Sequence, residues 1–304
     1  MSLFLFSCGM KKKEANEGFI QVTGGEVWYR IVGAGQKGIP LLVLHGGPGV
    51  PHDYLKPLEA LADERPVVFY DQLGCGLSES PSDTSLWTVG RFVEELKQVR
   101  TALNLEKVHI LGQSWGTMLA VEYLHREKPG GVVSLVLSAP YLNTERWVED
   151  QQQWIAQLPA DIQDTIRKYE ANRDFGSPAY QDAMMYFYRK HVCRIDPWPD
   201  CLNRAMEKMG MEVYERMWGP SEITMTGTLK NADLTGLLSE ITMPALFTCG
   251  EYDEATPTTT AFYQSKLPGS EMYIFNDASH SHHLERTDEY NQLVRDFLKK
   301  AERK

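Results

Sequence analysis

The chain has 304 residues, which is enough for one large α/β domain with an insertion or for two small domains. Its hydrophobic share of 42% and charged share of 24% are those of an ordinary globular protein. The net charge of −10 argues against a nucleic-acid partner, which would require a basic surface, and no stretch is long and apolar enough to span a membrane. The five cysteines include no C-x-x-C pair and no cysteine–histidine cluster, so they predict no metal site.

The first 13 residues, MSLFLFSCGMKKK, combine a short apolar run with Cys8 and three lysines. This order resembles the end of a bacterial lipoprotein signal, in which the cysteine carries the lipid, but the positive segment that should precede the apolar run is missing. Two interpretations stay open: a cytoplasmic protein, or a cell-envelope protein whose only membrane attachment is a lipid at Cys8. In both cases residues 1–17 are excluded from the predicted fold, and no oligomeric state is predicted.

Patterns typical of strands and helices alternate in the first third of the chain. Strands are predicted at 19–22, 27–31, 40–44 and 66–70, and helices at 54–61 and 89–103. Gly24-Gly25 predicts a hairpin between the first two strands. The next two strands are continuous apolar runs, which indicates burial on both faces. Each of these is followed by an unusual glycine-rich stretch, HGGPG from His45 and DQLGCGLS from Asp71.

The stretch KVHILGQSWGTMLA, from Lys107 to Ala120, predicts a strand, a tight turn and a helix. Its G-x-S-x-G would place Ser114 on a strained turn, with the hydroxyl exposed at the end of the strand. Trp115 then opens a helix, so its N–H can bind an anion. A serine that only caps the helix would give the same local pattern. The choice between nucleophile and cap therefore depends on the rest of the chain.

After the next predicted strand, at 132–137, the residue pattern changes from strand-like to helical. Between 141 and 230, aromatic and charged residues recur at helical spacing, and for most of these aromatics, such as Trp147 and Trp154, the expected role is helix packing. Strand patterns return at 244–248 and 272–275, and an amphipathic helix covers 288–299. We therefore predict an α/β fold. A mostly parallel central sheet flanked by helices is formed by residues 18–140 and 231–304, and residues 141–230 are inserted as an all-helical cap.

A serine nucleophile requires a base and a carboxylate that orients the base, and in α/β-hydrolases they follow the serine in the order acid, then histidine. Asp253 and His280 occupy this order, each just after a predicted strand. Two more histidines, His282 and His283, lie in the same loop, and from the residues alone any of the three could be the base. A metal site built from them would lack further ligands.

The carbonyl oxygen that gains charge during such a reaction requires two N–H donors that point at it. One is expected from the backbone of Trp115. The other is expected from Gly46 or Gly47 in HGGPG, because glycine allows the backbone to approach a substrate closely. We also expect Cys75, in the glycine-rich loop after strand 66–70, to lie near the pocket, so that bulky thiol reagents slow the enzyme.

Six motifs in order carry a resemblance over nearly the whole chain from about Phe19: HGGPG, DQLGCGLS, GQSWG, GPSEITMTG, GEYDEATP and the SH…E…Y ending. Together they resemble the proline iminopeptidase family, the prolyl aminopeptidases of the α/β-hydrolase fold. The resemblance implies that Ser114, Asp253 and His280 form the catalytic triad, and that Gly46, Gly47 and Trp115 form the oxyanion hole. One departure is Thr117, where this family commonly has glycine.

The same resemblance implies that Glu222 and Glu254 bind the free amine of the substrate and that Tyr214 lines the pocket. Without it, both glutamates would be read as surface carboxylates. The expected activity is that of a serine aminopeptidase, without a cofactor or a metal, which releases an N-terminal proline or small residue from short peptides or amides through an acyl-enzyme. The alternatives are an L-amino-acid amidase or esterase of the same fold, and a binding protein that kept the fold without catalysis.

Overall fold

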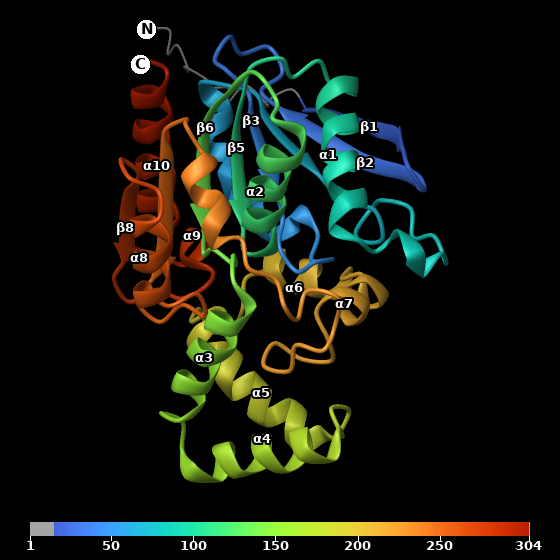
Figure 1. Cartoon of the computed structure of the whole chain (residues 1–304), viewed down its shortest axis with the longest axis vertical. Helices are drawn as coiled ribbons and strands as arrows, with labels where there is room; N and C mark the ends of the chain where they lie inside the picture. Colours follow the sequence, from blue (N-terminus) through green and yellow to red (C-terminus); the bar gives the residue numbers. More distant parts are fainter. Residues whose placement is uncertain (1–14, 304) are drawn as a thin grey trace, which may run out of the picture.

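The computed structural model describes residues 15–303, and its centre is one sheet of eight strands in the order β1-β2-β4-β3-β5-β6-β7-β8 (Figure 1). The strands are β1 (Ala15–Val22), β2 (Gly25–Val32), β3 (Leu41–Leu44), β4 (Val67–Tyr70), β5 (Val108–Gln113), β6 (Val132–Ser138), β7 (Ala245–Gly250) and β8 (Glu271–Phe275). From β4 through β3, β5, β6 and β7 to β8, each neighbouring pair of strands is parallel. The hairpin of β1 and β2 is antiparallel, and β2 also pairs antiparallel with β4. The predicted α/β class and the hairpin at Gly24-Gly25 are confirmed.

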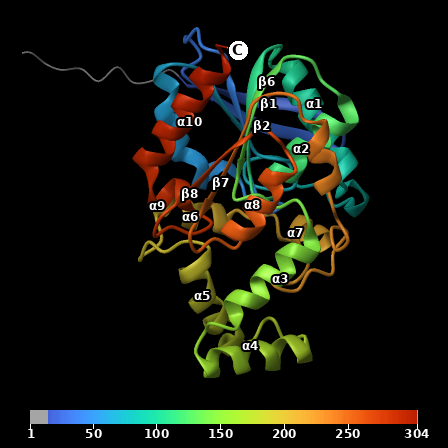
Figure 2. The same cartoon turned by 60° about the vertical axis from the view of Figure 1, so that its left-hand side comes forward.

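Helices cover both faces of this sheet because its central strands are apolar on both sides. Every residue of β3, β4, β5 and β7 is buried. One face is covered by α1 (Val89–Ala102) and α2 (Trp115–Glu127), and the other by α10 (Thr287–Ala301) (Figure 2). The other helical elements outside the cap are η1 (His52–Asp63), η2 (Thr84–Leu86), η3 (Thr235–Glu240), α8 (Pro257–Ser265) and α9 (His282–Glu285). The helix expected at 54–61 is a 3-10 helix with Pro57 inside it, a residue that cannot donate an α-helical hydrogen bond.

Five helices lie between β6 and β7 in the sequence, in the region predicted to form a cap. They are α3 (Thr144–Ile155), α4 (Ala160–Asn172), α5 (Pro178–His191), α6 (Asp200–Glu207) and α7 (Met211–Met217). Helices α3, α4 and α5 extend below the sheet in Figure 1, and α6 and α7 lie against its lower edge. The outer part of the cap has its own apolar cluster, which includes Leu158, Ile166, Tyr180 and Phe187. We call residues 141–230 the cap.

The fold begins earlier than the sequence indicates. Strand β1 starts at Ala15, which pairs with Val32, so excluding everything up to residue 17 removes the first three residues of a strand. The lipoprotein-like Cys8 lies outside the described residues. Within residues 15–303, no helix has both the length and the apolar character needed to cross a membrane.

Candidate active site

Ser114 lies on a sharp turn between β5 and α2. Its backbone angles are φ 53° and ψ −123°, a conformation that L-residues seldom adopt. The turn is crowded on both sides: a Cβ on Gly112 would lie 2.3 Å from the carbonyl oxygen of Gly116, and a Cβ on Gly116 would lie 2.2 Å from that of Leu44. Only glycine fits at these two positions. The expected strained turn is therefore present, and the local fold presents Ser114 at the end of the strand.

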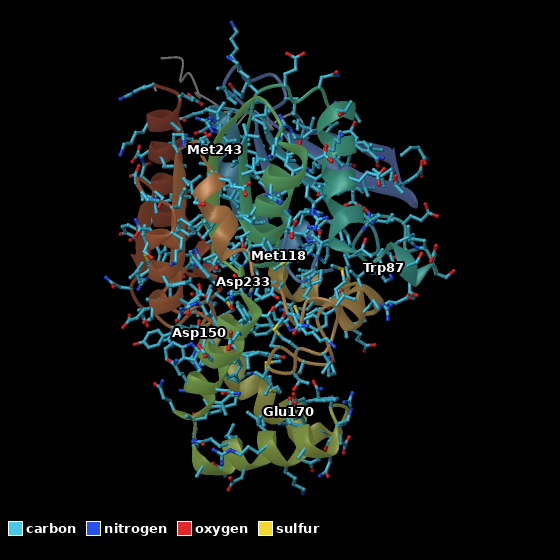
Figure 3. The ribbon with its side chains drawn as sticks, in the orientation of Figure 1. Trp87, Met118, Asp150, Glu170, Asp233 and Met243 are labelled. Atoms are coloured by element: carbon cyan, nitrogen blue, oxygen red, sulfur yellow. The ribbon has the colours of Figure 1, made fainter. Side chains whose placement is uncertain are left out.

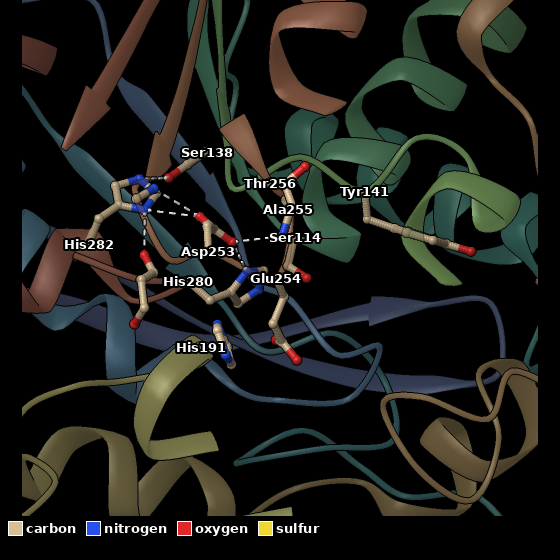
Figure 4. A network of polar contacts seen from close by, with 12 residues as sticks. Ser114, Ser138, Tyr141, His191, Asp253, Glu254, Ala255, Thr256, His280 and His282 are labelled. Carbon is tan, nitrogen blue, oxygen red and sulfur yellow. Dashed lines mark hydrogen bonds and ion pairs between the residues drawn. The ribbon is translucent and has the colours of Figure 1, made fainter. Parts of the chain in front are cut away.

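Asp253 and His280 are joined directly, as expected. His280 Nδ1 lies 2.7 Å from Asp253 Oδ1, and both side chains are buried (Figure 4). The carboxylate also accepts hydrogen bonds from the backbone N–H of Ala255 (2.9 Å) and of Gly250 (3.1 Å). These donors come from the loop that carries Asp253 itself, so the end of β7 fixes the acid in place. The acid in turn fixes the ring of His280.

The charges of this pair shift both pKa values. Burial alone would raise the pKa of Asp253, but the charge of His280 and its hydrogen bond outweigh burial and hold that pKa well below its usual range. Burial alone would lower the pKa of His280. The Asp253 carboxylate, supported by Glu254 and Glu222, reverses this effect and raises the pKa of His280 to about 9. Three carboxyl groups thus favour the imidazolium form of His280.

The structure distinguishes the three neighbouring histidines. His282 is fully buried, with Nε2 3.0 Å from the hydroxyls of both Ser138 and Thr248 and Nδ1 3.6 Å from Asp253 Oδ2. His283 is also buried, and burial lowers its pKa well below 6.5. Neither lines the pocket that contains Ser114, whereas His280 does. His282 Nδ1 also lies 3.2 Å from the carbonyl oxygen of Ser279, so this ring lies beside the second oxygen of Asp253 without a hydrogen bond to it, a position that the sequence left unassigned.

Ser114, His280 and both glutamates line one cavity of about 270 Å³. The rest of the wall comes from core residues such as Gly47 and Gln113 and from cap residues, both polar, such as Tyr214 and Ser221, and apolar. Within the described residues, no hydrogen bond joins the hydroxyl of Ser114 to the ring of His280. Such bonds are often long in ligand-free enzymes and shorten when substrate is bound. The structure therefore brings the serine to the same cavity as the Asp253–His280 pair.

The oxyanion hole differs from the expectation at one residue. The N–H of Gly46 donates a 2.7 Å hydrogen bond to the hydroxyl of Tyr54, and this hydroxyl donates to Gln113 Oε1 at 2.6 Å. The donor of Gly46 is therefore occupied, and the prediction that it binds the oxyanion is wrong. Gly47 lines the cavity and has a φ of 108°, and Trp115 is the first residue of α2. These two backbones remain as the candidate donors.

Glu222 and Glu254 enter the cavity from different parts of the chain, one from the cap and one from the loop after β7. Tyr214 donates a 2.6 Å hydrogen bond to Glu222, while Glu254 is buried and its Oε1 has no partner. Burial raises the pKa of Glu222, and burial together with the Glu222 charge raises that of Glu254 well above its usual range. No lysine or arginine in residues 15–303 pairs with either. This end of the cavity can therefore hold a cation.

Comparisons with known proteins agree with these observations. Residues 39–287 match the family model of the alpha/beta hydrolase fold. A proline iminopeptidase of Heyndrickxia coagulans is 46% identical over 283 residues, which cover 93% of this chain and 98% of that protein. The chain belongs to the proline iminopeptidase family. A relative of the same name from Saccharolobus solfataricus is 35% identical over 98% of this chain and 97% of its own. The crystal structure of the Mycobacterium smegmatis proline iminopeptidase has a TM-score of 0.87 and 36% identity, covering 94% of this chain and 98% of its own.

One departure from the proline iminopeptidase pattern has a local explanation. The hydroxyl of Thr117 donates a 2.7 Å hydrogen bond to the carbonyl of Ser114 and accepts one of 3.0 Å from the N–H of Tyr141. Thr117 therefore fits the first turn of α2 and ties it to the chain that leaves β6.

The sequence did not reveal that helix α3 holds the loops that carry the site. Trp154 Nε1 donates to the carbonyl oxygen of Asp253 (2.9 Å), Gln151 Nε2 to that of Glu254 (3.1 Å), and Trp147 Nε1 to that of Glu222 (3.3 Å). Residues 147, 151 and 154 share one helix face, since their spacing is four and three. That spacing is the only sequence signal, and it equally predicts ordinary packing.

The four cysteines in the described part of the chain do not form a reactive group at the site. Cys75 is buried, and burial raises its pKa well above the usual range. It does not line the cavity, so the structure gives no support to the expectation that bulky thiol reagents slow the enzyme through Cys75. Cys193, Cys201 and Cys249 are free thiols. The part of the chain that is described contains no group of three or more histidine, cysteine or acidic side chains placed to hold a metal.

Proposed function

We propose that the chain is a serine aminopeptidase that removes an N-terminal proline, or another small residue, from short peptides or amides. The observation that carries this proposal is the pair of carboxyl groups of Glu222 and Glu254, without a cationic partner, in the cavity that also contains Ser114 and His280. The family relationship to proline iminopeptidases supports the same reaction.

In the proposed reaction, the hydroxyl oxygen of Ser114 attacks the carbonyl carbon of the first residue. His280 Nε2 accepts the hydroxyl proton and then gives it to the leaving amine as the carbon–nitrogen bond breaks. Asp253 keeps the proton on Nδ1 and stabilises the imidazolium. A water molecule, deprotonated by His280, then attacks the carbonyl carbon of the ester. The bond from this carbon to the Ser114 oxygen breaks, and His280 gives the proton back to that oxygen. The N–H groups of Gly47 and Trp115 are proposed to stabilise both oxyanions.

The two glutamates are proposed to select a free amine. Each charge-assisted hydrogen bond to an ammonium is worth about 1.5–3 kcal/mol, so two would favour a free over a blocked N-terminus by about 10²-fold or more. Tyr214 supports this role because its hydroxyl holds the carboxyl group of Glu222 at 2.6 Å.

The test compares a prolyl anilide with an N-acetyl-prolyl ester in the wild type, Glu222→Gln and Glu254→Gln. At a pH above the acidic limb of the pH profile, we expect both variants to lose kcat/KM on the free-amine substrate and to retain it on the blocked ester. Equal losses on both substrates would disprove amine selection. Fluorophosphonate labelling that disappears in Ser114→Ala checks the nucleophile, and a panel of prolyl peptides, amides and esters separates a peptidase from an amidase or esterase.

A further inference from the structure

Glu222 lies in a short turn that is closed at both ends. Ser221 and Thr224 form an isolated antiparallel bridge, and the N–H of Thr224 donates to the hydroxyl of Ser221 (3.1 Å). Glu222 and Ile223 are the two residues between them. Ile223 packs on the apolar cluster of the outer cap, while Glu222 faces the cavity. The position of the turn, together with the hydrogen bond from Tyr214, therefore sets where the carboxyl group of Glu222 lies.

A second glutamate holds this turn from outside. Glu170, on α4, points from its helix toward the body of the molecule (Figure 3). Its Oε1 accepts a 3.1 Å hydrogen bond from the hydroxyl of Ser221, and its Oε2 accepts one from the hydroxyl of Thr224. Tyr180, on α5, donates a third hydrogen bond to Oε1. One carboxylate thus binds both ends of the turn and links it to two helices of the cap.

The partners of Glu170 are hydroxyl groups rather than cationic side chains. Within residues 15–303 it forms no ion pair with lysine or arginine, and its partners are three hydroxyl groups. Hydrogen bonds to a charged acceptor are stronger than those between neutral groups. Glu170 does not line the cavity, so it cannot contact a small ligand beside Ser114. Any effect on the reaction must pass through the turn or through α5, whose Gln181 and Tyr188 line the cavity.

We propose that Glu170 is a positioning residue for recognition of the substrate amine: it fixes the turn 221–224 so that Glu222 meets the ammonium opposite Glu254. This inference rests on the proposed function. In this inference the outer cap does more than cover the site. The hydrogen bonds that link α4 and α5 to the turn help to orient the group that binds the amine.

The first test replaces the acceptor. Glu170→Ala is expected to raise KM for a prolyl anilide about 10-fold, with a smaller change in kcat, because a misplaced binding group weakens orientation without removing the nucleophile. KM and kcat for the N-acetyl-prolyl ester, whose binding does not involve Glu222, should change by less than about 2-fold. Glu170→Gln keeps one acceptor oxygen and should lie between the wild type and Glu170→Ala.

The second test removes a donor instead. Thr224→Val keeps the size of the side chain but loses the hydroxyl that binds Glu170 Oε2, and it should raise the same KM. Asp164→Ala is the matched control: Asp164 is on the same helix, is exposed, and pairs only with Arg167 one turn away. Asp164→Ala should leave KM and kcat unchanged on both substrates. Thermal unfolding of each variant identifies any that fails to fold. If Glu170→Ala does not fold, the KM values of Glu170→Gln and Thr224→Val test the inference instead.

A double-mutant cycle with Glu222→Gln gives the decisive result. If Glu170 acts through Glu222, Glu170→Ala adds less than about 2-fold to the loss in Glu222→Gln. Independent, multiplicative losses would overturn the inference. It would also be overturned if Glu222→Gln abolished the preference for a free amine while Glu170→Ala and Thr224→Val kept it; the proposed function would then stand. If Glu222→Gln itself kept the preference, the proposed function would fall, and this inference with it.

Discussion

The indole ring of Trp147 meets the imidazole ring of His280 edge to face, with the ring centroids 5.8 Å apart. The same indole donates a hydrogen bond to the carbonyl of Glu222. One side chain of α3 therefore contacts both the candidate base and the segment that carries a candidate amine ligand. Changes at Trp147 should affect both functions, but by different routes.

Trp147→Phe keeps an aromatic ring beside His280 and loses the hydrogen bond to Glu222. Beyond the cost of replacing a buried indole by a smaller ring, we expect the free energy of unfolding to fall by about 1 kcal/mol, the usual contribution of one hydrogen bond, and the loss of activity to be confined to free-amine substrates. Trp147→Ala should reduce kcat on the blocked ester as well and destabilise the fold by about 3–5 kcal/mol. Chemical denaturation and kinetics on both substrates measure this. Trp87→Phe, at a buried indole whose nitrogen has no partner, is the control.

The pH dependence of activity should change when an acidic neighbour of His280 is removed. Glu254 and Glu222 both raise the pKa of His280, so Glu254→Gln should lower it. The free base then persists to lower pH. The acidic limb of the kcat/KM profile, measured on the N-acetyl-prolyl ester, should move toward lower pH. A shift toward higher pH would contradict the assigned electrostatics.

Stability should decrease in mild acid because four histidines are buried in the neutral form, His283 and three others. Burial lowers the pKa of His45, His109 and His191 from 6.5 to about 4. As pH falls, the unfolded chain binds these protons first, so the free energy of unfolding should fall between pH 6.5 and about 4. His109 lies far from the cavity, bonded to Ser134 and Glu302. His109→Gln should reduce the slope of the free energy of unfolding against pH by about 1.4 kcal/mol per pH unit in that window. An unchanged slope would refute the assignment.

The mouth of the cavity predicts which residue is preferred after the scissile bond. Its acidic end is closed, with Glu254 1% exposed, whereas Met206 (41%) and Met211 (51%) are open to solvent. An amine bound at the acidic end directs the leaving residue toward these methionines, which adapt to apolar groups of different shape. Pro-Leu should therefore be cleaved faster than Pro-Glu. Met206→Ser should reduce this ratio, and Met185→Ser, exposed but outside the cavity, should not.

Thiol labelling tests the burial of Cys75. In a Cys8→Ser background, a bulky reagent should modify only the half-buried Cys201 in the folded protein, because the other thiols are buried. Activity should be retained while Cys75 stays unmodified. Rapid modification of Cys75 together with inactivation would contradict the structure.

The sequence predicted those parts of the fold that local pattern determines. Apolar runs identified β3 to β7, and the G-x-S-x-G identified the turn at Ser114. It did not predict that the N–H of Gly46 is occupied, because the donor's direction depends on Tyr54, eight residues away. Nor could it show the contact of Glu170 with Ser221, which are 51 residues apart in the chain. In sequence alone, a glutamate of a polar helix has the pattern of a solvent-exposed residue.

The pairing of Glu222 with Glu254 has a consequence for turnover. A bound peptide presents a neutral amide to the site, but the freed amino acid presents a newly formed negative group close to Asp253 and Glu254. Like charges at such range repel each other strongly where water is scarce. The acids that attract the incoming chain terminus should therefore expel the liberated zwitterion, and inhibition by free proline should be weak.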